Sequence, residues 1–493
     1  MAEIAVLGLR CHMTRVVVVG GGIAGLAAAH RLLESGTEKQ LDLQVLLVEA
    51  APRLGGCIVT ERVGEFLVEG GPDSFITEKP WAVELCRRLS LTGSIIATRS
   101  ADQRIYVVHE GKLEPLPEGF LLMAPTRFWP FVRSPLFSWR GKARIAAETI
   151  WPRGRPNGDE SLASFVRRRF GREALERVAQ PLIGGIYAAD PERLSLASTM
   201  PRFREMERKC GSIIRAMRAE QRERGRAAAD ASGARWTFFA GLKNGIGELV
   251  DALVARLPAG TVRLGSRATT MRRKTRDGGW LVVLESGETL EAEAVILALP
   301  AYAAARLVEG IAPEASRALE TIRYASTATV NLAYRETEIP GRLAGFGFVV
   351  PAVEHRRIVA CTFSSLKYPG RAPAGHVLLR AFVGGSLKPE IFERSDDEML
   401  SDVRKDLAEL LGIRADPLFS RIHRHAMAMP QYHIGHTERV ERIEAQLAGF
   451  PGIALAGSAY RGVGIPDCIR SGEQAAERIV DRLAVPALRH GRQ

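Results

Sequence analysis

The stretch Arg15–Leu26, RVVVVGGGIAGL, decides the fold of the amino-terminal part of the chain. Its four consecutive valines predict a parallel strand buried on both faces, and the residues after it predict a helix through Leu33. Between them, Gly20, Gly22 and Gly25 have the spacing G-x-G-x-x-G. In such a unit the glycines permit a tight turn, close approach of backbone to a pyrophosphate and packing of helix on strand. The stretch therefore predicts a dinucleotide site at a helix amino terminus, where free N–H groups favour an anion.

An acidic residue at the expected distance strengthens this prediction. A second apolar strand, Val45–Val48, ends at Glu49, whose carboxylate can accept hydrogen bonds from both hydroxyls of a ribose. Without that context, the glycines would be equally consistent with a purely structural turn. The strand and the carboxylate favour the dinucleotide site.

Two more glycine-rich loops follow. Residues 51–60, APRLGGCIVT, place Gly55 and Gly56 where backbone can crowd a cofactor, and Arg53 where it can meet a phosphate or a ring edge. Residues 69–75, EGGPDSF, form another glycine-rich turn. These motifs together are far more specific than the first fingerprint alone, and they resemble the flavin-containing amine oxidase superfamily, which binds FAD in an extended pose.

Composition bounds the class of protein. The chain has 493 residues, 46% of them hydrophobic and 25% charged, as in globular proteins of about two to four domains. No apolar run approaches the roughly 18 residues of a transmembrane helix. Residues 1–12 are short and charged for a signal peptide, and Met13 is an alternative start. Six scattered cysteines without a C-x-x-C pair favour reduced thiols and a cytoplasmic protein.

The formal net charge of +12 has several possible explanations. Nucleic acid is one, but the arginines between Arg127 and Arg226 lie in apolar, helix-like sequence without a nucleic-acid motif, so no nucleic-acid partner is expected. An anionic membrane surface, a polycarboxylate substrate and a compositional bias toward arginine explain the charge equally well. Exposed aromatics beside arginines would suit a membrane interface, and an ordinary helical core is the alternative.

The rest of the chain suggests two further regions. Residues 104–216 begin with a predicted strand at Arg104–Val108, followed by a turn and Lys112–Pro117, and then predict mainly helices with interspersed aromatic residues. Arg208–Arg235 predicts an exposed helix or loop. Residues 311–437 predict an antiparallel sheet followed by a helix at Asp396–Leu411. Near the end, a short strand at residues 452–457 and a glycine-rich segment lead into a helix, whose amino terminus can face the pyrimidine end of a flavin.

Three internal segments and the carboxyl-terminal one narrow the resemblance. QPLIGGIYAADPERLS at 180–195, TFSSLKYPGRAP at 362–373, AMPQYHIGH at 428–436 and GVGIPDCIRSG at 462–472 resemble the protoporphyrinogen oxidase family over nearly the whole chain from Met13. The family implies an α/β fold with a discontinuous Rossmann-like FAD-binding domain, an α+β substrate domain with an antiparallel sheet, and a helical membrane-associating subdomain. We expect the FAD-binding domain at residues 13–93, 248–309 and 438–486. The substrate domain is expected at residues 94–103, 217–247 and 310–437, and the helical subdomain at residues 104–216.

The resemblance also implies site residues. Arg104 matches an arginine that pairs with a substrate propionate, Gly185 lies in a loop where backbone approaches a tetrapyrrole, and Val349 and Tyr368 fall near positions that cover the macrocycle. No catalytic base and no metal ligand is implied. The cofactor-binding positions from the motifs and the resemblance are Gly20, Gly22, Ile23, Ala24, Gly25, Glu49, Ala50, Arg53, Gly55, Gly56, Gly71, Pro72, Asp73, Ser74, Ala268, Gly457, Val463, Gly464 and Ile465.

The implied reaction is the six-electron oxidation of protoporphyrinogen IX to protoporphyrin IX at non-covalent FAD, with O2 reduced to hydrogen peroxide, in heme biosynthesis. A coproporphyrinogen III oxidase, an amine oxidase and a carotenoid desaturase remain alternatives. The family further implies association with the inner face of the cell membrane, a ferrochelatase as partner and a homodimer. Ala189 and His425 depart from the family pattern, which has glycine and tryptophan there, and His425 is not expected to act as a base.

Overall fold

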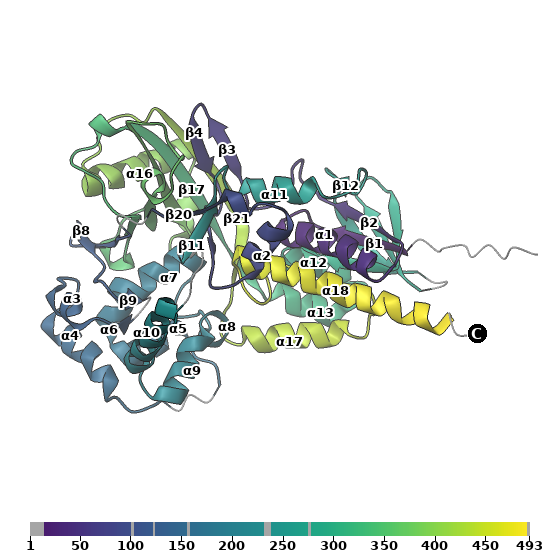
Figure 1. Ribbon diagram of the computed structural model, residues 1–493, viewed down its shortest axis with the longest axis horizontal. Coiled ribbons are helices and arrows are strands. Elements are labelled where there is room, and N and C mark those ends of the chain that lie inside the picture. Colours follow the sequence, from purple (N-terminus) through teal and green to yellow (C-terminus); the bar gives the residue numbers. More distant parts are fainter. Residues whose placement is uncertain are drawn as a thin grey trace, which may run out of the picture.

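The computed structural model describes residues 14–99, 103–121, 124–154, 158–230, 238–274 and 278–490. Figure 1 shows three regions: a parallel sheet with its helices, a second sheet beside it, and a cluster of helices beneath that second sheet. The alternative start at Met13 lies outside the described residues.

The parallel sheet contains the fingerprint strand at its centre. The strand order is β12-β2-β1-β16-β22, and every neighbouring pair is parallel. The strands are β1 (Thr14–Val19), β2 (Leu43–Val48), β12 (Val262–Arg263), β16 (Ala294–Leu297) and β22 (Ile453–Leu455). Because they come from the beginning, middle and end of the chain, the predicted discontinuity of this sheet is confirmed.

Each face of this sheet is covered by its own core. Val16 and Val18 pack with α1 (Ile23–Glu38), α2 (Trp81–Arg88), α11 (Gly247–Val254) and α18 (Ile465–His490). Val17 and Val19 pack on the opposite face with a small antiparallel sheet and three helices. These elements are β13 (Ala268–Arg273), β14 (Trp280–Leu284), β15 (Thr289–Ala292), α12 (Ala301–Val308), α13 (Pro313–Glu320) and α17 (His436–Leu447). The four valines are thus all buried, as a strand covered on both faces requires.

The second sheet has seven strands in the order β21-β17-β20-β19-β18-β7-β8. They are β7 (Ile105–His109), β8 (Lys112–Pro115), β17 (Arg323–Arg335), β18 (Gly347–Val349), β19 (Ala360–Phe363), β20 (His376–Gly384) and β21 (Phe419–Gln431). The sheet is mixed, because β18 pairs with β7 in parallel while the other pairs are antiparallel. One face packs on α16 (Asp396–Leu411), whose bounds match the predicted helix.

The helical region packs on the other face of the second sheet. Its core includes Phe165 and Val178 and reaches the sheet through Val107, Val349 and Ala360. Its helices are α3 (Phe128–Arg133), α4 (Trp139–Ala146), α5 (Leu162–Phe170), α6 (Arg172–Ala174), α7 (Gln180–Tyr187), α8 (Leu196–Thr199), α9 (Pro201–Cys210) and α10 (Ile213–Asp230). A buried ion pair between Arg169 and Glu148 ties α5 to the segment after α4.

The strand expected at Arg104–Val108 is present as β7, and residues 112–115 form β8 beside it in the second sheet. Two other local expectations need correction. The segment from Arg208 was predicted to be exposed, but α10 begins with buried Ile213, Ile214 and Met217 because this end enters the helical core. Strand β21 was not predicted at all.

Among the residues that the structure describes, no helix is both long and apolar enough to cross a bilayer.

Candidate functional site

The fingerprint turn has the geometry that its glycines allow. Gly20 has a φ of +109°, and a Cβ there would lie 2.3 Å from the carbonyl oxygen of Ala298. A Cβ on Gly25 would lie 1.9 Å from the oxygen of Gly20, so only glycine lets α1 pack this closely on the turn. A Cβ on Gly22, by contrast, would meet nothing within 4 Å. Gly22 therefore faces open space at the amino terminus of α1, where the first N–H groups have no partner within the helix.

Glu49 follows β2 at the same edge of the sheet. Its two carboxylate oxygens accept hydrogen bonds from the N–H groups of Gly21 (2.6 Å) and Ala51 (2.7 Å). These bonds fix the carboxylate beside the turn and leave each oxygen a second acceptor position. The chain just before Ala268 runs alongside Glu49, since Ser266 N–H donates to the backbone carbonyl oxygen of Glu49 (2.7 Å).

The loop after Glu49 closes over the turn. Gly55 N–H donates to the oxygen of Gly21 (2.9 Å), and a Cβ on Gly56 would lie 3.3 Å from the Cα of Gly22. Arg53 donates to three carbonyl oxygens of its own loop, those of Leu54, Gly56 and Ile58. Its guanidinium thus orders this loop, and a contact with a phosphate or a ring edge stays a prediction.

The next glycine-rich loop is tied to the second sheet. A Cβ on Gly71 would lie 1.9 Å from the oxygen of Cys57, so this loop packs against the previous one. The buried Asp73 carboxylate accepts from Lys367 (3.1 Å) and Ser74 (2.8 Å) and pairs with Arg380 (3.0 Å). Although burial opposes its ionisation, Arg380 and Lys367 hold the pKa of Asp73 well below its usual range. Its carboxylate is therefore a charged anchor between the regions, and a cofactor contact through Asp73 stays a prediction.

A third glycine-rich segment precedes α18. Gly457 has a φ of +117°, and no atom lies within 4 Å of a Cβ placed on it. Val463 and Gly464 lead into Ile465, the first residue of α18. Burial raises the pKa of the Cys468 thiol to about 12, so the thiol stays protonated and is a poor nucleophile for flavin attachment.

The fingerprint turn, Glu49 and the segment before α18 together fit a flavin dinucleotide. Open space at Gly22 beside the start of α1 suits a pyrophosphate, and the fixed Glu49 carboxylate suits a ribose. The start of α18 supplies a second helix amino terminus, which suits the pyrimidine end of the ring. FAD would supply the hydride-accepting chemistry when bound.

The residues predicted to bind substrate lie at different depths. Arg104 immediately precedes β7 and is exposed, and its guanidinium lies 5.9 Å from the centre of the Tyr106 ring. Gly185 in α7 is exposed, with nothing within 4 Å of a Cβ. Val349 is buried and pairs in register with Val107, three residues after Arg104.

Tyr368 lies deeper than the other predicted substrate residues. Only 1% of it is exposed, and its ring packs against Gly241 and lies 5.5 Å from the guanidinium of Arg371. Its hydroxyl is buried without a hydrogen-bond partner, and a contact of Tyr368 with the macrocycle stays a prediction.

Sequence reasoning missed a set of partly exposed apolar side chains, which we call the apolar surface. Phe382, Tyr187 and Val463 are partly buried and pack against the same core as Val349 and Ala360. Val463 belongs to the segment before α18 and Phe382 to β20, so the apolar surface has members in the cofactor segment and in the second sheet. No short motif signals it, because its members come from α7, β18, β19, β20 and the loop before α18.

His425 also has a local partner. Its Nε2 lies 2.8 Å from the carbonyl oxygen of Gly70, and Thr329 Oγ1 donates to the same oxygen (2.7 Å). Together they fasten the loop that leads to Asp73. Both contacts are structural, and the absence of a base role for His425 stays a prediction.

Known proteins resemble this chain over nearly its full length. The profile of the flavin containing amine oxidoreductase family matches residues 23–480. A coproporphyrinogen III oxidase of Bacillus subtilis is 37% identical over 466 residues, covering 93% of this chain and 96% of the relative. A chloroplastic protoporphyrinogen oxidase of Oryza sativa is 32% identical over 490 residues, covering 95% and 88%.

A solved structure has the same arrangement. The crystal structure of an Exiguobacterium protein, provisionally named a protoporphyrinogen oxidase, superimposes with a TM-score of 0.83 at 31% identity, covering 95% of this chain and 99% of that one. Together with the glycine turns and the fixed Glu49 carboxylate, these matches show that the chain belongs to the flavin-containing amine oxidoreductase family.

Proposed function

We propose that this FAD-dependent oxidoreductase oxidises a porphyrinogen, converting protoporphyrinogen IX to protoporphyrin IX in heme biosynthesis. The reaction removes six electrons and six protons as three two-electron oxidations. Three molecules of O2 accept them and become three molecules of hydrogen peroxide. The proposal is supported by the full-length similarity to relatives named for porphyrinogen oxidation.

The observation that carries the proposal is the apolar surface beside the cofactor segments. Val463, Phe382 and Tyr187 offer a water-poor contact of the kind that a flat, largely apolar macrocycle needs. The exposed Arg104 at the start of β7 suits a propionate, because a guanidinium binds a carboxylate through two parallel hydrogen bonds. Exposed Gly185 leaves room for the ring to approach the backbone of α7.

Coproporphyrinogen III is the second candidate substrate. The relatives from Bacillus subtilis and Propionibacterium freudenreichii, each 37% identical, are both named coproporphyrinogen III oxidase. This substrate has four propionates instead of two, and the net charge of +12 suits either. Electrostatics alone therefore does not separate the two candidates.

We further propose that the helical region associates with a membrane surface at the inner face of the cell membrane. Five large apolar side chains between residues 128 and 151 of this region are exposed: Phe128, Trp129, Trp139, Ile150 and Trp151. Lys142 lies 4.4 Å from the centre of the Trp139 ring, and Arg144 lies 4.2 Å from that of Trp151. Basic groups beside exposed aromatics suit an anionic interface. The domain boundaries, a homodimer and a ferrochelatase partner stay predictions.

The decisive experiment compares aerobic turnover of protoporphyrinogen IX and coproporphyrinogen III by the FAD-loaded protein, followed by porphyrin fluorescence. A higher kcat/KM for protoporphyrinogen IX supports the main proposal, and a higher value for coproporphyrinogen III assigns the second substrate. Turnover of neither would overturn both.

The same assay tests Arg104. Arg104→Ala should raise KM roughly tenfold or more, because a charge-assisted hydrogen bond contributes about 1.5–3 kcal/mol, while FAD content stays unchanged. Arg414→Ala, on the exposed surface after α16, is the matched control. An unchanged KM in Arg104→Ala would remove this residue from the substrate site.

A further inference from the structure

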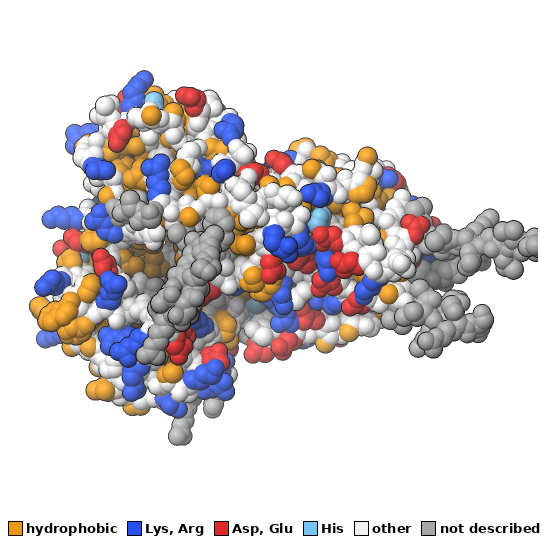
Figure 2. Space-filling view, in the orientation of Figure 1, with side chains coloured by type: hydrophobic (Ala, Val, Ile, Leu, Met, Phe, Trp, Pro, Cys, Tyr) orange, Lys and Arg blue, Asp and Glu red, His pale blue; other side chains and the backbone are white. Residues whose placement is uncertain are grey.

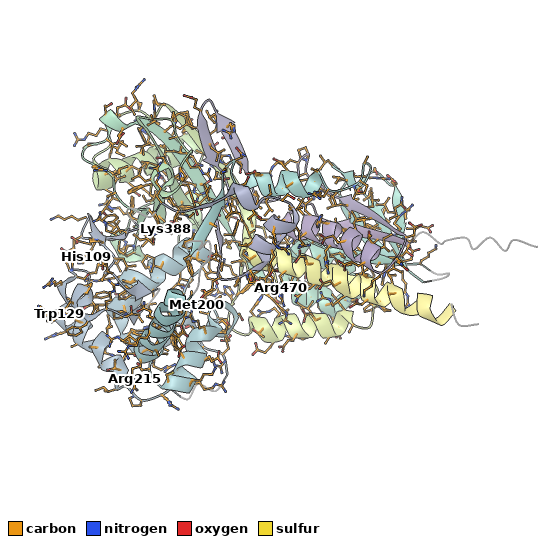
Figure 3. All side chains as sticks on the ribbon, viewed as in Figure 1. His109, Trp129, Met200, Arg215, Lys388 and Arg470 are labelled. Atoms are coloured by element: carbon orange, nitrogen blue, oxygen red, sulfur yellow. The ribbon has the colours of Figure 1, made fainter. Side chains whose placement is uncertain are left out.

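The segment Gln431–His436 crosses between all three regions of the molecule. It begins at the last residue of β21 and ends at the first residue of α17. On the helical side, the carbonyl oxygen of Tyr432 accepts a hydrogen bond from Ser195 N–H (2.7 Å), and Gln431 Nε2 donates to the oxygen of Tyr187 (3.2 Å). Figure 3 labels Met200 in the helical region and Arg470 in α18, two of the regions that this segment joins.

The hydroxyl of Tyr432 reaches the loop before α18. It donates to the carbonyl oxygen of Ser458 (2.6 Å) and accepts from Gly462 N–H (2.8 Å). Only 1% of Tyr432 is exposed, so these bonds form away from water. The single hydroxyl therefore joins both ends of the loop 458–462.

His436 supports this arrangement from the same segment. Its ring stacks on that of Tyr432, with centres 3.9 Å apart and planes 12° apart, and its Nε2 lies 2.9 Å from the carbonyl oxygen of Tyr460. Burial lowers the pKa of His436 to about 4, so the imidazole is neutral. Its Nδ1 has no hydrogen-bond partner, which assigns the proton to Nε2 and makes Tyr460 the acceptor.

The loop that these two rings hold ends at the cofactor segment. Gly462 has a φ of +135° and immediately precedes Val463, Gly464 and Ile465. A Cβ on Gly462 would lie 2.4 Å from Cγ of Asp467, and Asp467 is itself bonded to Lys79 (2.6 Å). The direction in which α18 begins is thus fixed on one side by Tyr432 and on the other by Lys79.

We propose that Tyr432, with His436 stacked on it, is a positioning residue for the flavin. By holding Ser458 and Gly462, it sets where the amino terminus of α18 lies relative to the ring. Through its backbone and Gln431, the same segment joins the cofactor loop to Tyr187 at the apolar surface. The inference rests on the FAD site of the proposed function and is independent of which porphyrinogen is oxidised.

The test is Tyr432→Phe, which keeps the ring and removes the hydroxyl. Ser458 and Gly462 then each lose a buried hydrogen bond, which frees the loop. We expect the Kd for FAD to rise about tenfold, which corresponds to ~1.4 kcal/mol. The visible flavin absorption bands and the two-electron midpoint potential should shift as well. Tyr334→Phe, which makes the same change at a buried tyrosine of β17, is the control and should alter none of these quantities.

A second variant keeps the proposal testable if Tyr432→Phe does not accumulate as folded protein. His436→Phe preserves a stacked ring but loses the bond to Tyr460, and it should shift the Kd and the potential in the same direction by less. If the folded variant has the FAD affinity, spectrum and potential of the Tyr334→Phe control, the positioning role is overturned. The Kd, the absorption bands and the potential are all measured on FAD without substrate. A failure of the protein to oxidise porphyrinogens would therefore not affect them.

Discussion

Glu69 is a buried carboxyl group at the end of β4 (Phe66–Glu69), on the loop that leads to Asp73. It accepts hydrogen bonds from Thr60 Oγ1 (2.5 Å) and Ile246 N–H (2.8 Å). Burial nevertheless raises its pKa from 4.5 to about 7, because these bonds and the nearby Arg371 only partly offset the loss of hydration. The folded protein therefore keeps a proton that the unfolded chain releases between these two pH values.

The raised pKa of Glu69 determines whether the free energy of unfolding rises or falls with pH. Because the folded state binds more protons in that window, the free energy of unfolding should fall as the pH rises from 4.5 to 7, by at most about 3 kcal/mol. Glu69→Gln should remove that contribution, and urea unfolding at pH 5 and pH 7 measures it. Glu65→Gln, at an exposed position on the same hairpin, is the control. An equal pH slope in wild type and Glu69→Gln would show that Glu69 does not titrate there.

At the scale of the element, two glycines in the turn between β1 and α1 have different roles. Gly25 is needed for stability, and Gly22 is expected to be needed for cofactor binding. Gly25→Ala should destabilise the protein by about 1–3 kcal/mol or more, since its Cβ collides with Gly20. Gly22→Ala meets no protein atom, so its thermal unfolding without cofactor should match the wild type. Its methyl group occupies the space that suits the pyrophosphate, and FAD should bind at least about tenfold more weakly.

Fluorescence titration with FAD and thermal unfolding measure both effects. Gly310→Ala, where a Cβ also meets nothing within 4 Å, controls for the loss of backbone freedom. Normal FAD affinity in Gly22→Ala would place the pyrophosphate elsewhere.

The elements also show what the sequence could predict. The fingerprint strand, the second strand before Glu49, α16 and the final helix follow from local periodicity and glycine spacing, and these elements are confirmed. The ribose contact of Glu49 stays a prediction. Strand β21 was missed because FSRIHRHAMAMPQ has no clear alternation of apolar and polar residues, and its pairing with β17 determines its conformation. Tyr368 and Tyr432 depend on contacts with segments far along the chain, such as Gly241 and Ser458, which no local pattern encodes.

At the scale of the whole molecule, the exposed apolar side chains of residues 128–151 lie on the helical region, away from the parallel sheet. Figure 2 shows hydrophobic side chains beside basic ones at the end of the helical region, where Figure 3 labels Trp129, opposite the end with the carboxyl terminus. Trp129 is 66% exposed and Trp139 is 74% exposed. A membrane docked here would lie beside the helical region, with the parallel sheet held away from it.

Vesicle sedimentation tests this orientation. Replacing Trp129 and Trp139 by serine should weaken binding to phosphatidylglycerol vesicles at least about fivefold, or ~1 kcal/mol. Phe238→Ser, at a 53% exposed aromatic outside this group, should leave binding unchanged. Equal binding of the double variant and the control would assign any membrane affinity to another surface.

The order in which strands join the parallel sheet has a consequence for biosynthesis. Val16 of β1 pairs with Ala294 of β16, and Val295 of β16 pairs with Ile453 of β22. At ~5–20 residues per second on the ribosome, β1 is made roughly tens of seconds before β22, the last strand to join this sheet. Helix α18, which packs against α1, emerges later still. The fingerprint turn is thus made several hundred residues before the strand and the helix that complete the fold around it.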